Sequence, residues 1–110
     1  MCPGPTAVGT DELLRPLEAG DAVILDVRPG PEYAGGHLPG AIHIPLEELA
    51  ERLAELPANR EIVAYCRGQY CVLAHDAVRL LSARGLRARR AADGVLEWRL
   101  AGVRFETDAA

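Results

Sequence analysis

The 110-residue sequence contains only three cysteines, an odd and low number that excludes the disulfide framework of a small secreted protein. It has no apolar run close to the length of a membrane span, and residues 1–6 lack the basic and apolar parts of a secretory leader. We therefore expect a cytoplasmic protein with no membrane partner. Lysine is absent, all twelve basic residues are arginine, and the net charge of −4 gives no reason to expect nucleic-acid binding.

What the sequence does contain is sufficient for one globular domain. A chain of 110 residues, 49% hydrophobic and 25% charged, is large enough to bury a core without metal or disulfide support. Residues 1–9 are rich in Pro, Gly, Ala and Thr, and we interpret them as a loose lead-in. We expect the domain to span residues 10–106 and residues 107–110 to form a tail.

Apolar runs that suit buried strands alternate along the chain with segments of helical periodicity. The predicted elements are a helix over 11–15 capped by Thr10, a strand over 22–27, a brief helical turn over 32–34, a strand over 41–44, a helix over 46–56, a strand over 61–65, a helix from the loop after Cys66 to Gly85, a weak strand over 87–92 and a helix over 95–100. Strands separated by helices predict a single α/β domain with a central, mostly parallel sheet and helices on both faces.

Cys66 follows the strand predicted over residues 61–65 and precedes a short loop that leads into a helix. A strand, a loop containing Gly68 and a helix N-terminus together build a cradle for an anion. This cradle favours the thiolate, which is the reactive form of cysteine. The alternative is a small buried core cysteine. A core position does not need Arg67 and Gly68 beside it, so we interpret Cys66 as a nucleophile.

Four segments, in this order, resemble the rhodanese family of sulfurtransferases over residues 10–106. They are residues 25–28 with the Glu-Tyr pair that follows at 32–33, residues 36–45, residues 65–67 and residues 93–98. The loop sequence over 66–74 is most similar to rhodanese modules attached to arsenic-responsive winged-helix repressors of bacteria. The resemblance implies a single rhodanese-like domain.

The resemblance also implies a chemistry in two steps. The Cys66 thiolate attacks the sulfane sulfur of a donor such as thiosulfate, sulfite departs, and the Cys66 persulfide passes its sulfur to a thiol acceptor or to cyanide. The expected partners are therefore a small sulfur-donor anion and a thiol, either a small molecule or a protein. No set of His, Asp and Glu residues has metal-ligand spacing, so we expect neither a metal nor another cofactor.

Site residues follow from the same resemblance. The substrate-binding loop after Cys66 consists of Arg67, Gly68, Gln69, Tyr70, Cys71 and Val72. The resemblance gives Asp26 a role in ordering the surroundings of the site, implies that Arg28 together with Glu32 braces the adjacent loop, and makes His37 a loop-fixing hydrogen-bonding residue. A surface ion pair of small energetic value is the alternative for Asp26 and Arg28.

Cys71 departs from the family pattern and leaves two interpretations open. It is either a small residue packed near the start of the helix or a resolving thiol that closes a disulfide with Cys66. Two rival functions remain. One is a sensor of redox state, sulfur or arsenite, or a protein-binding module. The other is a phosphate or arsenate enzyme, which is disfavoured because Cys71 or Val72 stands where an arginine would close the loop.

Overall fold

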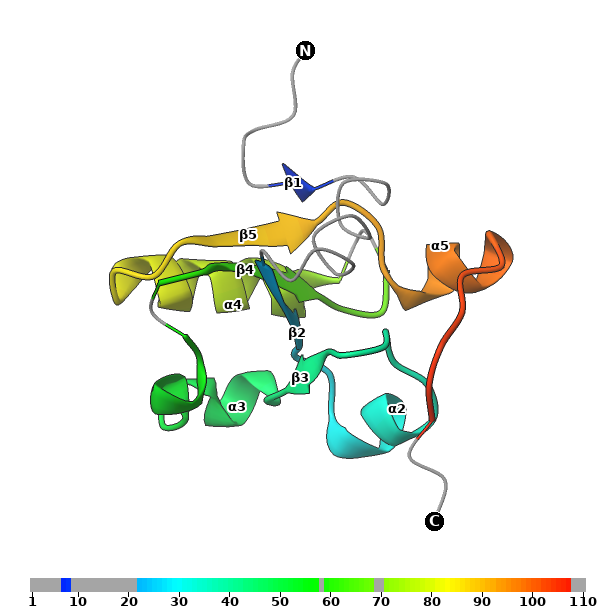
Figure 1. The fold of residues 1–110 in the computed structure, drawn as a ribbon, viewed down its shortest axis with the longest axis horizontal. Coiled ribbons are helices and arrows are strands. Elements are labelled where there is room, and N and C mark those ends of the chain that lie inside the picture. Colours follow the sequence, from blue (N-terminus) through cyan, green and yellow to red (C-terminus); the bar gives the residue numbers. More distant parts are fainter. Residues whose placement is uncertain (1–6, 9–21, 58, 69–70, 108–110) are drawn as a thin grey trace.

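The computed structural model describes residues 7–8, 22–57, 59–68 and 71–107, and the helix expected over 11–15 lies outside them. Within these residues the chain forms a five-stranded sheet in the order β1-β5-β4-β2-β3, in which every neighbouring pair is parallel (Figure 1). The strands are β1 (Ala7–Val8), β2 (Ala22–Asp26), β3 (Ile42–His43), β4 (Glu61–Tyr65) and β5 (Ala88–Ala91). The predicted α/β fold is confirmed.

The two central strands run side by side over their full length. β2 and β4 pair from Ala22 opposite Glu61 to Asp26 opposite Tyr65. Their carboxyl ends therefore meet at one edge of the sheet, which is where ligands bind in parallel α/β sheets. The first residues beyond this edge are Val27 and Cys66.

Helices cover both faces of the sheet. The helices are α2 (Gly30–Ala34), α3 (Leu46–Leu49), α4 (Val72–Ala83) and α5 (Val95–Leu100), with a 3-10 turn η1 (Leu53–Glu55) after α3. Ile62, Ala64 and Cys66 belong to a core cluster that also contains the buried residues of α3 and α4. Val63 and Tyr65 belong to a second cluster that contains Val95 and Trp98 of α5. Side chains alternate between the faces because successive strand residues point in opposite directions.

Several predicted bounds match the structure closely, and one predicted helix is wrong. The strand over 61–65 and the helix over 95–100 have the expected limits. The helix expected over 46–56 is instead the single turn α3 followed by η1. A leucine spacing of three and four residues is compatible with a 3-10 turn as well as with an α-helix, so the buried Leu49 and Leu56 do not require a continuous helix.

Two short pairings complete the fold. β1 adds a strand beside β5 from within the segment expected to be a loose lead-in. Near the other end of the chain, His37 and Glu106 form an isolated antiparallel bridge with two backbone hydrogen bonds of 2.9 Å. Within the described ranges, none of the helices has the length and apolar character needed to cross a bilayer.

Candidate active site

The cysteine loop joins the end of β4 to the start of α4. Cys66 follows β4 directly and is 2% exposed, whereas Cys71 is half-buried and occupies the N-cap position of the twelve-residue helix α4. The Cys71 N–H donates to the Gly68 carbonyl at 3.1 Å, and the two cysteine sulfurs are joined in a disulfide. The structure thus brings together the predicted nucleophile and the predicted second thiol. Gln69 and Tyr70 lie outside the described residues.

The first residues of α5 form hydrogen bonds with the backbone of the first half of this loop. The Val95 N–H donates to the Cys66 carbonyl at 3.1 Å, and the Leu96 N–H donates to the Arg67 carbonyl at 2.7 Å. Gly94 fits so closely beneath the loop that an added Cβ would lie 2.6 Å from the Cys66 oxygen and 2.5 Å from the Gly68 nitrogen. This role of Gly94 was missed from the sequence, where a glycine immediately before a helix was the only signal.

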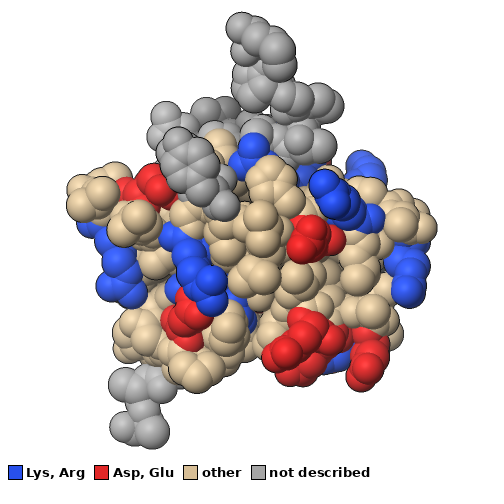
Figure 2. All heavy atoms as spheres, turned by 180° about the vertical axis from the view of Figure 1, so that it is seen from behind, with Lys and Arg blue, Asp and Glu red and all other residues tan. Residues whose placement is uncertain are grey.

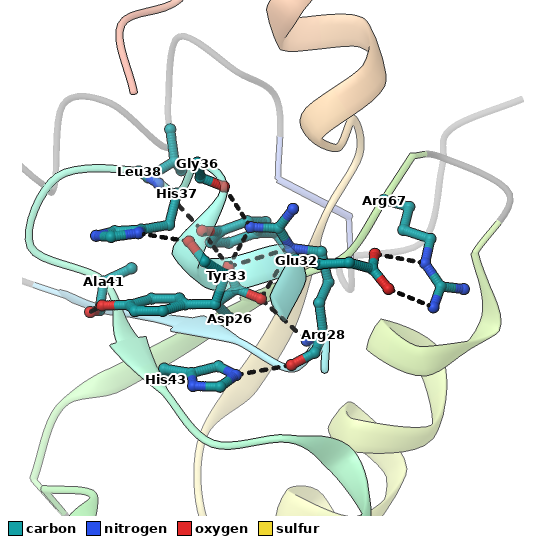
Figure 3. A network of polar contacts seen from close by, with 11 residues as sticks. Asp26, Arg28, Glu32, Tyr33, Gly36, His37, Leu38, Ala41, His43 and Arg67 are labelled. Atoms are coloured by element: carbon teal, nitrogen blue, oxygen red, sulfur yellow. Dashed lines mark hydrogen bonds and ion pairs between the residues drawn. The ribbon is translucent and has the colours of Figure 1, made fainter. Parts of the chain in front are cut away.

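A buried polar network lies beneath the same sheet edge (Figure 3). The Asp26 carboxylate accepts hydrogen bonds from Arg28 Nε at 3.0 Å, from Arg28 Nη2 at 2.6 Å and from the Tyr65 hydroxyl at 2.7 Å. Arg28 Nη2 also donates to the Gly36 carbonyl at 2.6 Å, and the Leu38 N–H donates to the Tyr65 hydroxyl at 3.1 Å. The network therefore ties β2 and β4 to the loop after α2.

The Asp26–Arg28 ion pair of this network is buried, which affects the pKa values of Arg28 and Tyr65. Asp26 is 0% and Arg28 3% exposed, so the alternative of a surface ion pair is wrong. Burial lowers the pKa of Arg28, but hydrogen bonding to Asp26 and its negative charge outweigh this and raise the pKa above its usual value. Burial, followed by the charge of Asp26, raises the pKa of Tyr65 well above its usual value. Arg28 is therefore a cation and Tyr65 a neutral hydroxyl donor. Sequence reasoning missed Tyr65, whose only signal was a polar group at the end of a buried strand.

Arg28 and Glu32, which we expect together to brace the adjacent loop, contact different segments. Arg28 is committed to Asp26 and Gly36, and Glu32 instead forms a bidentate ion pair with Arg67, with Nε–Oε1 and Nη2–Oε2 distances of 2.7 and 2.8 Å. The hydrogen bonds from Arg67 hold the pKa of Glu32 below its usual value, and in turn raise the pKa of Arg67. Glu32 on α2 therefore anchors the first residue of the cysteine loop.

His37 has the hydrogen bonds expected of a loop-fixing residue. Its Nδ1 lies 2.9 Å from the Tyr33 carbonyl oxygen, and its backbone pairs with Glu106. The Tyr33 ring is sandwiched between two imidazoles, with centroid distances of 3.8 Å to His37 and 4.3 Å to His43 (Figure 3). His43 Nε2 lies 2.7 Å from the Arg28 carbonyl oxygen, so the stack is connected to the buried network.

Arg67 lines two cavities. The first, of about 350 Å³, is lined by three arginines, one glutamate and three residues without charge, namely Arg28, Glu32, Gly35, Arg67, Val95, Leu96 and Arg99. The second, of about 290 Å³, is lined mainly by apolar residues between β2, α3 and α4, including Val27, Leu46 and Leu73. Elsewhere on the surface, basic and acidic side chains are interspersed on the face that Figure 2 shows. The described part of the chain contains no group of three or more His, Cys, Asp or Glu side chains arranged to hold a metal.

Comparison with known proteins places the chain in a family. The rhodanese-like domain model matches residues 9–101. The HTH-type transcriptional regulator Rv0324 of Mycobacterium tuberculosis is 56% identical over 103 residues, which are 94% of this chain and 46% of that protein. The chain therefore spans about half the length of that regulator. A sulfurtransferase of Allochromatium vinosum is 36% identical over 47 residues, covering 43% of this chain and 44% of that protein.

A solved structure agrees with the sequence comparisons. The thiosulfate sulfurtransferase from Pseudomonas aeruginosa has a TM-score of 0.81 to this chain at 28% identity, covering 94% of this chain and 20% of that one. The shared parallel sheet, and a family match that extends from before β2 to beyond α5, confirm the resemblance found in the sequence. The chain belongs to the rhodanese-like domain family.

Proposed function

We propose that this domain is a sulfurtransferase that carries sulfane sulfur on Cys66, from thiosulfate or a similar donor to a thiol acceptor. The observation that supports this most directly is the position of Cys66. It lies at the end of a central strand, between its neighbour Arg67 and the hydrogen bond from the Val95 N–H, and both of these residues line the 350 Å³ cavity. Family membership and the sulfurtransferase relatives agree with this function.

In the first step the Cys66 thiolate attacks the outer sulfur of thiosulfate. A bond forms between Cys66 Sγ and that sulfur, the sulfur–sulfur bond of thiosulfate breaks, and its electron pair leaves with sulfite. In the second step an acceptor thiolate, or cyanide in an assay, attacks the outer sulfur of the persulfide, and Cys66 leaves as a thiolate. Neither step requires a general base, because thiolate is the attacking form and sulfite is a good leaving group.

The charges around the cavity suit a small anionic donor. Arg28, Arg67 and Arg99 line it, against the single carboxylate of Glu32. Asp26 already neutralises Arg28, and Glu32 neutralises Arg67, so Arg99 is the cation with no carboxylate partner among the described ion pairs. A cavity with a surplus of positive charge attracts a dianion such as thiosulfate.

The test begins from reduced protein, because the disulfide must be opened by a dithiol before Cys66 can react. After removal of the reductant, thiosulfate should add one sulfur, located on Cys66 by intact mass, to the Cys71→Ser protein, in which no second loop thiol can displace it. Cys66→Ser should take up no sulfur and should lose transfer from thiosulfate to cyanide, whereas the matched variant Cys2→Ser should keep that transfer. A well-folded Cys66→Ser protein that still turns over would remove the proposal.

A sensing module is the second candidate function. It is favoured by the disulfide between Cys66 and Cys71 and by the 56% identity to part of a transcriptional regulator. The two functions differ in turnover. An enzyme forms many equivalents of thiocyanate per chain when thiosulfate and cyanide are both in excess, whereas a sensor stops after one modification of its cysteine pair.

A further inference from the structure

The fold holds the two cysteines of the loop at bonding distance from two different elements. Cys66 is fixed by the end of β4 and by the hydrogen bond from Val95, and Cys71 is fixed by the start of α4. The turn between them is closed by the bond from the Cys71 N–H to the Gly68 carbonyl. The meeting of the two sulfurs is therefore a property of the sheet and helix frame, which places their Cα atoms 6.1 Å apart.

The two sulfurs have different surroundings. Cys66 is 2% exposed within the core cluster between the sheet and α4, whereas Cys71 is half-buried at the N-cap of α4. The Cys71 side chain forms no capping hydrogen bond, and the N–H groups of the first helical turn face the N-cap region. Negative charge is stabilised there, which favours a Cys71 thiolate once the disulfide is open.

In the structure, Cys71 Sγ is bonded directly to Cys66 Sγ. In a Cys66 persulfide whose outer sulfur points away from Cys71, the Cys71 thiolate lies beside the inner sulfur, on the side opposite the leaving group. From there it can attack the inner sulfur in line and displace the outer one, as in thiol–disulfide exchange.

From this geometry we propose that Cys71 resolves the Cys66 persulfide, so that the domain reduces sulfane sulfur to sulfide; this inference rests on the proposed function. The Cys71 thiolate attacks Cys66 Sγ, the bond from Cys66 Sγ to the outer sulfur breaks, and the electron pair leaves with that sulfur as hydrosulfide. The Cys66–Cys71 disulfide is the other product. The sulfane sulfur gains two electrons, and the two cysteine thiols supply them.

The formation of the Cys66 persulfide and its resolution by Cys71 together reduce the outer sulfur of thiosulfate to sulfide. Thiosulfate and the two cysteine thiols give sulfite, hydrosulfide and the disulfide seen in the structure. An external dithiol then reduces the disulfide and prepares the site for another cycle. In the absence of a dithiol, one exposure to sulfane sulfur leaves Cys66 and Cys71 joined in the disulfide, and the disulfide persists after the donor is gone. The same pair can therefore serve an enzyme or a sensor, depending on the supply of reductant.

The experiment uses the full chain carrying Cys2→Ser, so that Cys66 and Cys71 are its only thiols. The reduced protein, freed of reductant, receives thiosulfate whose outer sulfur is isotopically labelled. We expect release of about one labelled sulfide per chain and formation of the disulfide by intact mass, because the second thiol attacks intramolecularly. With Cys71→Ser added, we expect labelled persulfide on Cys66 with a lifetime at least about tenfold longer, because an intramolecular thiol acts at millimolar or higher effective concentration.

The possible failures are distinguishable. If the Cys71→Ser protein and its parent hold the persulfide equally long and release no sulfide, the inference is overturned while the proposed function stands. If the label is found in a persulfide on Cys71, Cys71 attacks the outer sulfur and the inference is likewise overturned. If neither protein acquires the label on Cys66, the proposed function is overturned and the inference with it. Sulfide release by the parent requires no substitution in the loop, so the test does not depend on the folding of the Cys71→Ser variant.

Discussion

Replacing Asp26 by asparagine removes one negative charge from the buried network and keeps the shape of the side chain. Arg28 then retains its charge with its side chain 4% exposed and no carboxylate against it. Removing one partner of a buried ion pair costs about 3–5 kcal/mol, because the remaining charge is buried without compensation. An amide nitrogen also replaces one of the oxygens that accept from Arg28 and Tyr65. A domain of this size has a free energy of unfolding of about 5–15 kcal/mol, so Asp26→Asn should remove a large fraction of it.

The matched control is Glu48→Gln, which makes the same chemical change in an ion pair on the surface. Glu48 pairs with Arg52 at 3.0 Å, with side chains 49% and 33% exposed. Exposed pairs of this kind contribute about 0–1 kcal/mol, so the free energy of unfolding should hardly change. Urea unfolding can be followed through the fluorescence of Trp98, which is the only tryptophan of the chain and is 1% exposed beside Tyr65.

A double-mutant cycle isolates the charge from the shape. Replacing Arg28 by methionine should be strongly destabilising in the wild type and much less so in the Asp26→Asn background, because the second change removes the charge left without a partner. We expect a coupling free energy of at least about 2 kcal/mol. An Asp26→Asn protein no less stable than Glu48→Gln would refute the assignment of a buried, charged pair.

Two further predictions concern residues that the sequence did not single out. Gly94→Ala should destabilise the fold by about 1–3 kcal/mol through overpacking, and should slow persulfide formation, because the new Cβ would push against the backbone of Cys66 and Gly68. Gly30→Ala, whose new Cβ would approach only His43 Cε1 at 3.9 Å, is the control, and equal urea midpoints for the two variants would contradict the close fit. Tyr65→Phe should cost about 1–3 kcal/mol at pH 7, because it leaves the Leu38 N–H without its acceptor. That cost should shrink above the usual tyrosine pKa of 10.0, where the unfolded chain ionises and the folded hydroxyl, with its raised pKa, does not; unfolding curves with a constant difference from pH 7 to 11 would contradict it.

The features of the fold that the sequence predicted are those with a local cause. The apolar run over 61–65 predicted β4 with its observed limits, because a strand buried on both faces is a nearly continuous run of apolar residues. The helix over 95–100 was also predicted with its observed limits. The helix over 46–56 was wrong because its leucine spacing fits two kinds of helical turn, and only packing selects between them.

In the candidate site, too, the features with a local cause in the sequence were predicted, and those that depend on distant residues were not. Cys66 and its loop were found because a strand end, a glycine and a helix start follow one another in the sequence. The ion pair of Glu32 with Arg67 was missed, because the two residues are 35 apart in the sequence and no local pattern encodes that approach. The hydrogen bond from Tyr65 to Asp26 joins residues 39 apart and depends on the register of β2 against β4. Long-range polar pairs require the three-dimensional arrangement.

The end of β4 explains how a rigid buried network and a reactive sulfur coexist in adjacent residues. Tyr65 points into the core cluster with Trp98, and Cys66 points into the opposite cluster with α4, because consecutive strand residues alternate between the faces. The Asp26 network therefore acts on the sulfur mainly through the backbone of β4. Among the described residues, the side chains of Asp26, Arg28 and Tyr65 form no hydrogen bond or ion pair with the cysteine loop. Changes to the network should consequently alter the fraction of folded protein far more than the rate of sulfur uptake per folded molecule. Changes to Gly94, whose contacts are with the loop itself, should alter both.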